Sequence, residues 1–238
     1  MTPNELLAEV RSRLASAATA KFREGLLWFF KEPVDPYGVR TPEVRRIAAA
    51  AYREVKHWPI ARRNRLASDL WKSGKLEEGT IAVCLFQRFR KDFSTAEFLL
   101  FERWIDRYVR NWAHCDGVAS WLLAACLAND PSLISRVRTW TVSQNRWKRR
   151  AAAVALLQEA KQGRNAGAIA DVAGDLIADS DDMVQKGVGW LLKETYPKRP
   201  REVMTFLVPR KDRASRLLLR IAAEKMTAGD RARLLDKR

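Results

Sequence analysis

Apolar residues recur along most of the chain at intervals of three and four positions, the period of one face of an α-helix. Alternating runs of β-branched residues, which would indicate half-buried strands, are absent. Thr41 and Pro42 supply an N-cap and a first-turn proline for a helix that extends to about Val55. Ser94 and Glu97 have the spacing of a capping box and precede an apolar run. The pattern therefore predicts an all-α protein.

Further helix starts divide the chain into short elements. About a dozen helices of roughly 10–18 residues are expected over the whole chain. Helical pairs in residues 94–128, 131–161 and 164–195 indicate a unit of about 30–40 residues, the scale of HEAT-like repeats. The other marked starts are at Asp130-Pro131, with a helix to about Thr141, at residues 180–182, and at Pro200, with a short helix before Pro209.

The chain carries no linker rich in Gly, Ser or Pro, and its one long non-helical stretch covers residues 32–38. A helical pair of this kind cannot bury its apolar face alone, so neighbouring pairs must stack. We therefore expect residues 1–238 to form a single domain, a HEAT-like helical-repeat solenoid that is curved and has a basic concave face.

The charge balance narrows the choice of partner. Lys and Arg total 44 against 28 Asp and Glu, a formal net charge of +16. Nucleic acid is the favoured partner for such an excess, and a solubilising surface or an acidic protein partner is the alternative. The basic residues gather in three clusters: Arg146, Lys148, Arg149 and Arg150; Lys193, Lys198, Arg199 and Arg201; and Arg210, Lys211, Arg213, Arg216 and Arg220.

Other features of the sequence exclude several classes of protein. No apolar run approaches the roughly 20 residues that span a bilayer, and residues 1–14 have the pattern of an amphipathic helix, so a cytoplasmic protein is expected. Three cysteines and two histidines without zinc-ligand spacing predict no metal site and reduced thiols. Phosphate-binding Gly loops, GxSxG and HExxH are absent.

Trp112 and Asp116 are the strongest candidates for chemistry. Residues four apart on a helix lie on one face, so an indole and a carboxylate point the same way. His114 is rotated by about 200° from Trp112 and is interpreted as structural. Asp116 is either a surface aspartate paired with Arg110 or Arg150, or a carboxylate that stabilises a cation; the spacing leaves both open.

Trp190 is the other tryptophan of interest, because Gly187 and Gly189 precede it and leave little bulk beside its ring. Glycine inside a helix costs about 1 kcal/mol relative to alanine, so two of them indicate a close approach, for which tight helix packing is the simpler explanation. Six other tryptophans are assigned to the core: Trp28, Trp58, Trp71, Trp104, Trp121 and Trp140.

Four stretches taken in order give the chain a family resemblance. It resembles the AlkD-type DNA glycosylases, the HEAT-like-repeat enzymes of DNA alkylation repair. The matching stretches cover nearly the whole chain and are residues 37–46, 111–116, 147–152 and 184–194. Residues 29–35 do not align cleanly, so no cleft aromatic is assigned there.

The resemblance implies an enzyme that hydrolyses the N-glycosidic bond of N3- and N7-alkylated purines, such as 3-methyladenine and 7-methylguanine, without base flipping. It implies that Asp116 is catalytic, that Trp112 and Trp190 flank the lesion deoxyribose, and that Arg150 grips the DNA backbone. We assign Arg149 and Lys148 to the same backbone contact. No cofactor is expected, and one solenoid around one duplex suggests a monomer.

The residue types suit this reaction. An N3- or N7-alkylpurine is already cationic and leaves without protonation, so a single carboxylate is sufficient. Positive charge then develops on the sugar, where a carboxylate and two indole faces would stabilise it and the carboxylate could orient water. A non-catalytic DNA-structure binder on the same fold and a helical-repeat scaffold for protein partners remain the alternatives.

Overall fold

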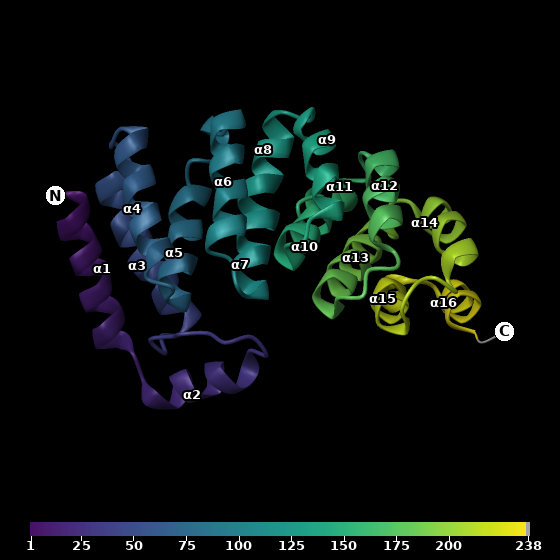
Figure 1. The fold of residues 1–238 in the computed structure, drawn as a ribbon, viewed down its shortest axis with the longest axis horizontal. Helices are drawn as coiled ribbons and strands as arrows, with labels where there is room; N and C mark the ends of the chain where they lie inside the picture. Colours follow the sequence, from purple (N-terminus) through teal and green to yellow (C-terminus); the bar gives the residue numbers. More distant parts are fainter. Residues whose placement is uncertain (237–238) are drawn as a thin grey trace.

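The structure, a computed structural model, describes residues 1–236, which are helical with connecting loops (Figure 1). Within that range there is no strand, and a single isolated bridge joins Asp35 to Lys75. The all-α prediction is therefore confirmed. The α-helices are α1 (Pro3–Ala17), α2 (Ala20–Phe29), α3 (Thr41–Val55), α4 (Ile60–Lys72), α5 (Leu76–Gln87), α6 (Thr95–Arg107), α7 (Trp112–Gly117), α8 (Ala124–Asn129), α9 (Leu133–Arg138), α10 (Arg146–Val154), α11 (Leu157–Gln162), α12 (Ala166–Leu176), α13 (Asp182–Thr195), α14 (Pro200–Leu207), α15 (Arg216–Ala222) and α16 (Ala228–Leu235).

Short segments of other helical types connect several of these elements. A π-helix, η2 (Val118–Leu123), joins α7 to α8 without a break in the backbone. The 3₁₀ segments are η1 (Arg90–Asp92), η3 (Thr139–Val142), η4 (Val208–Arg210) and η5 (Ala223–Lys225). None of the helices in the described range has the length and apolar content needed to cross a membrane.

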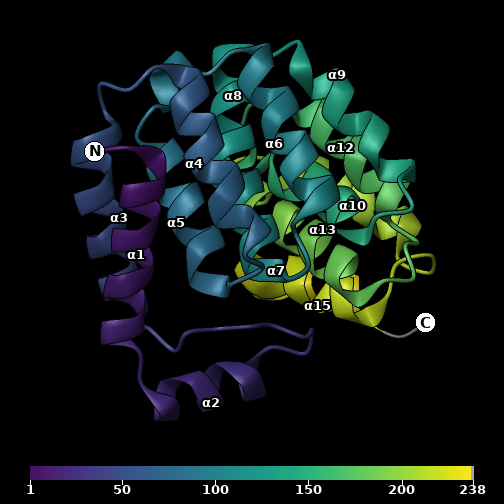
Figure 2. The same cartoon turned by 60° about the vertical axis from the view of Figure 1, so that its left-hand side comes forward.

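Apart from α2, the helices stack in chain order from the N-terminus to the C-terminus (Figures 1 and 2). One row of helices packs in succession: α3 on α5, α5 on α7, α7 on α10, α10 on α13, and α13 on α15. The helices between them, among them α4, α6 and α12, pack against the members of that row. The sequence units predicted at 94–128, 131–161 and 164–195 each correspond to helices packed against one another.

The predicted helix starts are mostly confirmed. Ser94 forms the capping box with Glu97, and the side chain of Asp181 accepts hydrogen bonds from the first turn of α13. Two boundaries differ from the expectation. Thr41 lies inside α3 and the cap position is Arg40, whose side chain makes no capping bond. The helix expected from Asp130 begins only at Leu133, because Asp130 accepts hydrogen bonds from Ser132 in a turn before it.

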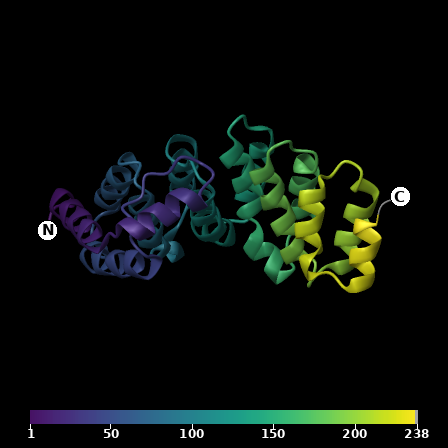
Figure 3. The same cartoon turned by 90° about the horizontal axis from the view of Figure 1, so that it is seen from below.

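A single apolar core runs through the stack. Its largest fully buried side chains include Trp104, Phe98 and Phe101. The assignment of Trp28 to the core was wrong, because Trp28 is 88% exposed. It lies on α2, which buries none of its residues and is set apart from the stack, below the N-terminal half (Figures 1 and 3). An apolar residue on a helix can be buried only if another element covers it.

Two buried glutamates of α5 fix the segment that follows α2. The carboxylate of Glu77 accepts hydrogen bonds from the backbone N–H groups of Tyr37, Gly38 and Val39 at 2.9–3.0 Å. The neighbouring Glu78 accepts from the Tyr37 hydroxyl at 2.7 Å and forms an ion pair with Arg11 of α1. These carboxylates bind one loop and one helix to α5, so they position the whole N-terminal segment.

Gly38 is required in this loop for two reasons. Its φ is +95°, a backbone conformation that side-chain-bearing residues rarely adopt. A Cβ added there would also lie 2.6 Å from the carbonyl oxygen of Thr19. At Gly38 the backbone of the loop therefore approaches the start of α2 more closely than a residue with a side chain would allow.

Glu77→Ala is expected to lower the free energy of unfolding by about 3 kcal/mol or more, because three backbone donors in a buried place lose their acceptor. Urea denaturation measures the loss. Glu77→Gln keeps the shape and one carbonyl acceptor, so its loss should be smaller. An alanine variant within about 1 kcal/mol of the parent would contradict this role of Glu77.

Candidate active site

Asp116 and Arg150 form the central contact of the candidate site. Asn111 caps α7 by accepting a hydrogen bond from the His114 N–H at 2.9 Å, and α7 then carries Trp112 and Asp116 on neighbouring turns. Arg150 comes from α10, and its Nε and Nη2 donate to the two oxygens of Asp116 at 2.8 Å each. Its Nη1 donates to the carbonyl of Met183. One guanidinium therefore connects α7, α10 and α13.

This ion pair is largely removed from water, and Arg150 is only 5% exposed. Burial raises the pKa of the Asp116 carboxyl, and the hydrogen bonds and charge of Arg150 oppose that rise. Burial lowers the pKa of Arg150, but the hydrogen bonds and charge of Asp116 outweigh it, so that pKa is raised. Of the two partners considered for Asp116, Arg150 is the one observed. Arg110 instead donates to backbone carbonyls.

Trp190 and its two glycines lie on α13, the next helix of the row. A Cβ at Gly187 would lie 3.3 Å from Cγ of Arg150, and a Cβ at Gly189 would lie 2.9 Å from Ile221. Both glycines are thus explained by helix packing, the simpler of the two explanations. Trp190 is half-buried and follows Gly187 by about one turn of α13. Within residues 1–236 the rings of Trp112 and Trp190 make no direct contact.

The structure adds two aromatic side chains that the sequence analysis left out. The Phe30 ring stacks on Trp112 with centroids 5.4 Å apart, and the Phe29 ring meets Trp112 edge-on at 5.8 Å. Phe30 is buried, whereas Phe29 is 58% exposed. No cleft aromatic was assigned in residues 29–35, and the structure places Phe29 and Phe30 of that stretch against the Trp112 ring. The sequence signal for this contact was the pair of adjacent aromatic residues at the end of the helix.

His114 is a structural residue, as the sequence indicated. Its Nε2 lies 2.8 Å from the carbonyl of Leu76, which can only accept, so Nε2 carries the proton. Its Nδ1 then accepts from the Asn111 side-chain amide at 3.2 Å. Burial lowers the pKa of His114 to about 4, with the hydrogen bond to Leu76 opposing that change. The imidazole is therefore neutral in the folded protein at neutral pH.

The buried neutral His114 makes stability depend on pH. Its pKa in the folded state, about 4, lies below the ordinary value of 6.5. Between these two pH values the imidazole is protonated in the unfolded state but stays neutral in the folded state. The stability that it contributes is present above pH 6.5 and is lost as pH falls to about 4, in total about 3 kcal/mol.

Urea denaturation between about pH 7 and about pH 4 measures this loss, and His114→Gln should reduce the slope of stability against pH. His57→Gln, at an exposed position, is the matched control and should keep the parent slope. A parent slope that is unchanged in His114→Gln would contradict the assignment.

The basic cluster that precedes the α10 core residues is already paired with acids. The Nζ of Lys148 lies 3.0 Å from both Glu102 and Asp106, and Arg149 contacts Asp179 at 2.7 Å. Glu102 and Asp106 lie on α6 and Asp179 lies in the loop before α13, so the cluster helps to join neighbouring elements of the stack. A phosphate contact from Lys148 or Arg149 would compete with these ion pairs, and it stays a prediction.

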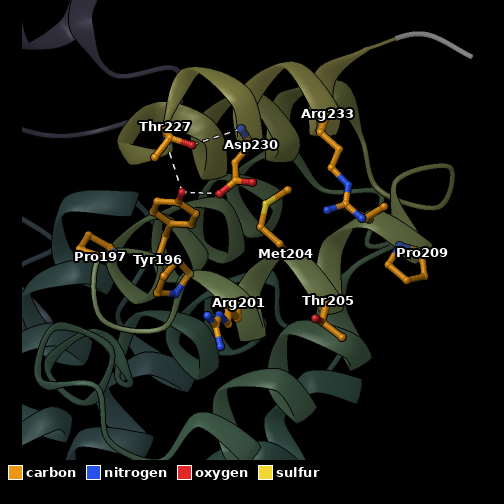
Figure 4. Close-up of a pocket in the computed structure, with 11 residues that line it drawn as sticks. Tyr196, Pro197, Arg201, Met204, Thr205, Pro209, Thr227, Asp230 and Arg233 are labelled. Atoms are coloured by element: carbon orange, nitrogen blue, oxygen red, sulfur yellow. Dashed lines mark hydrogen bonds between the residues drawn. The ribbon is translucent and has the colours of Figure 1, made fainter.

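Other regions offer fewer groups for chemistry. A pocket of about 800 Å³ lies between α14 and α16. The Tyr196 hydroxyl donates to Asp230 there at 2.6 Å, and Arg201 and Arg233 are among the lining residues (Figure 4). It shares no residue with the Asp116 site. Within residues 1–236 no group of three or more His, Cys, Asp or Glu side chains could hold a metal ion.

Comparison with known proteins identifies the family. The profile of the family described as DNA alkylation repair enzyme matches residues 10–226. The chain belongs to this family. No curated protein matched the sequence. The solved structures that share this fold include the following two. One is described as a predicted DNA alkylation repair enzyme from Enterococcus faecalis; it has a TM-score of 0.80 and 16% identity, covering 89% of this chain and 97% of that chain.

The second solved structure is AlkD2 from Streptococcus mutans. It has a TM-score of 0.61 and 21% identity, covering 79% of this chain and 91% of that chain. At these identities the similarity to solved structures shows a shared fold. The resemblance to the AlkD-type family that the four sequence stretches indicated is confirmed.

Proposed function

We propose that this protein is a DNA glycosylase that hydrolyses the N-glycosidic bond of cationic N3- and N7-alkylpurines in duplex DNA, without flipping the base. The observation that carries the proposal is the arrangement of Asp116. It lies one turn from Trp112 on α7 and is held by Arg150 of α10, which also contacts α13 at Met183 and Gly187. Family membership supports DNA as the substrate.

The proposed mechanism uses the carboxylate of Asp116 to stabilise charge. As the glycosidic bond breaks, the electron pair leaves with the alkylpurine and positive charge develops on the deoxyribose. A carboxylate beside that sugar stabilises the cation and orients the water that attacks it. Indole faces from Trp112 and Trp190 would add cation–π attraction of about 0.5–2 kcal/mol each. These attractions grow in the transition state, which is the condition for catalysis.

We also propose that Phe29 and Phe30 form a third aromatic element of the site, since both contact Trp112. The duplex would lie along a basic concave face of the curved stack, with one protein copy per duplex. Arg213 and Arg220, which have no ion-pair partner within residues 1–236, can contact phosphates without breaking an existing ion pair. Arg150, Arg149 and Lys148 would contact the backbone near the lesion.

One observation favours a second candidate, a DNA-structure-binding protein without excision activity. Both carboxylate oxygens of Asp116 are engaged by Arg150 in this structure. A carboxylate fully occupied in this way is less available to a sugar cation or a water molecule. In that case, the Asp116–Arg150 pair only joins α7 to α10.

The test is incubation of methylated duplex DNA with the protein, followed by chromatography of the freed bases. Release of 3-methyladenine or 7-methylguanine above the spontaneous rate supports the glycosylase. Salt-sensitive DNA binding without release of either base would support the non-catalytic binder. Negligible duplex binding at moderate salt would contradict both and favour a scaffold for protein partners.

A further inference from the structure

Glu32, in the loop after α2, presents a carboxylate that the mechanism above does not use. Its Oε2 is shielded from solvent and has no hydrogen-bond partner within residues 1–236. Buried polar atoms are nearly always satisfied, and an unpaired carboxylate oxygen is costly to hold away from water. An unsatisfied oxygen of this kind is a candidate for interaction with a bound group.

Two observations bring Glu32 near the Asp116–Arg150 pair. Phe30, two residues earlier, stacks on Trp112, and that stack carries the loop onto α7. The charge of Glu32 also contributes to the raised pKa of Arg150, after the larger effects of burial and Asp116. Glu32 nevertheless lies outside ion-pair distance of Arg150, whose three guanidinium nitrogens donate to Asp116 and Met183.

The charges of Asp116, Arg150 and Glu32 together determine how far from the site a cation is attracted. Asp116 and Arg150 form a one-to-one ion pair, so together they are neutral and attract a cation only at short range. A second carboxylate makes the net charge of the three groups negative. A net negative site attracts a cation from further away, because a charge–charge interaction falls off more slowly than that of a charge with a neutral pair.

We propose that Glu32 supplies this net negative charge, and that it strengthens both the preference for cationic lesions and the stabilisation of the sugar cation. Glu32 acts at a distance through its charge and makes no bond to the reacting atoms. The inference rests on the proposed glycosylase function. It assigns a role to the N-terminal segment, which Glu77 and Glu78 hold in place.

The experiment compares Glu32→Gln with the parent on a duplex that carries one 7-methylguanine. Single-turnover excision with enzyme in excess gives the rate constant, and fluorescence anisotropy gives the affinity for undamaged duplex. At the effective dielectric constant typical of protein sites, we expect the rate constant to fall by about ten-fold. Affinity should be unchanged or slightly higher, because the substitution removes a negative charge near a polyanion.

Two further variants separate charge from structure. Glu32→Asp keeps the charge and should retain more excision activity than Glu32→Gln. Glu24→Gln changes the net charge equally, at an exposed position on α2, and should match the parent. Equal rate constants for the parent and Glu32→Gln, or for the Asp and Gln variants, would overturn the inference while leaving parent excision intact. Absence of excision by the parent would instead refute the proposed function.

Discussion

Asp116→Asn is expected to lower the rate constant for alkylpurine excision by about 100-fold or more, while affinity for undamaged duplex DNA stays close to that of the parent. The substitution keeps the size and shape of the side chain but removes its charge. The proposed mechanism depends on that charge, because the cation on the sugar exists only as the bond breaks. Binding of the intact duplex depends mainly on Lys and Arg contacts to phosphates.

The measurement is single-turnover excision of 7-methylguanine, together with a DNA-binding titration. The Asp116→Asn substitution would leave the buried guanidinium of Arg150 without a charged partner, so stability is measured on the same samples and excision is assayed well below the unfolding transition. Asp171→Asn, at an exposed ion pair with Arg138, is the matched control. Equal excision by parent and Asp116→Asn would remove Asp116 from the mechanism.

Arg150→Ala is expected to lower the free energy of unfolding by about 3–5 kcal/mol, because it leaves Asp116 buried without its partner. It also removes the bond to the Met183 carbonyl and so loosens the contact between α10 and α13. If Arg150 contacts a phosphate, affinity for all duplexes falls, and the slope of log affinity against log salt decreases by about 1.

Urea denaturation and anisotropy titrations at several salt concentrations measure these two effects separately. Arg138→Ala, which breaks an exposed ion pair with Asp171 and Asp175, is the control and should cost less than about 1 kcal/mol. The double variant Asp116→Leu/Arg150→Leu should recover part of the lost stability, because no lone charge remains buried. A parent-like salt slope in Arg150→Ala would show that Arg150 is a structural residue only.

Several features of the fold could be predicted because they depend on residues near one another in the chain. Helix starts at Ser94 and Asp181 follow from side chains that bond within one turn. The shared face of Trp112 and Asp116 follows from helical period alone. The Thr41 cap and the helix start at Asp130 were misplaced by about one to three residues, since competing local bonds decide such boundaries.

The candidate site was predicted only in part, for a different reason. Arg150 was one of two partners that the sequence allowed for Asp116, and only the packing of α10 on α7 selects it. Phe29 and Phe30 were missed because they contact Trp112 from the end of α2 and the start of the loop that follows it. That loop is placed by Glu77 and Glu78, which are about 40 residues further along the chain.

By itself, the sequence determined the all-helical fold, the order of the helices, the basic character of the protein and the family to which it belongs. These properties depend on composition, on helical period and on short stretches of residues. Only the tertiary structure decided that Trp28 is exposed, that Lys148 and Arg149 are already paired, and that one guanidinium joins three helices. Burial and ion pairing depend on which surfaces meet in space, and residues far apart in the chain contribute those surfaces.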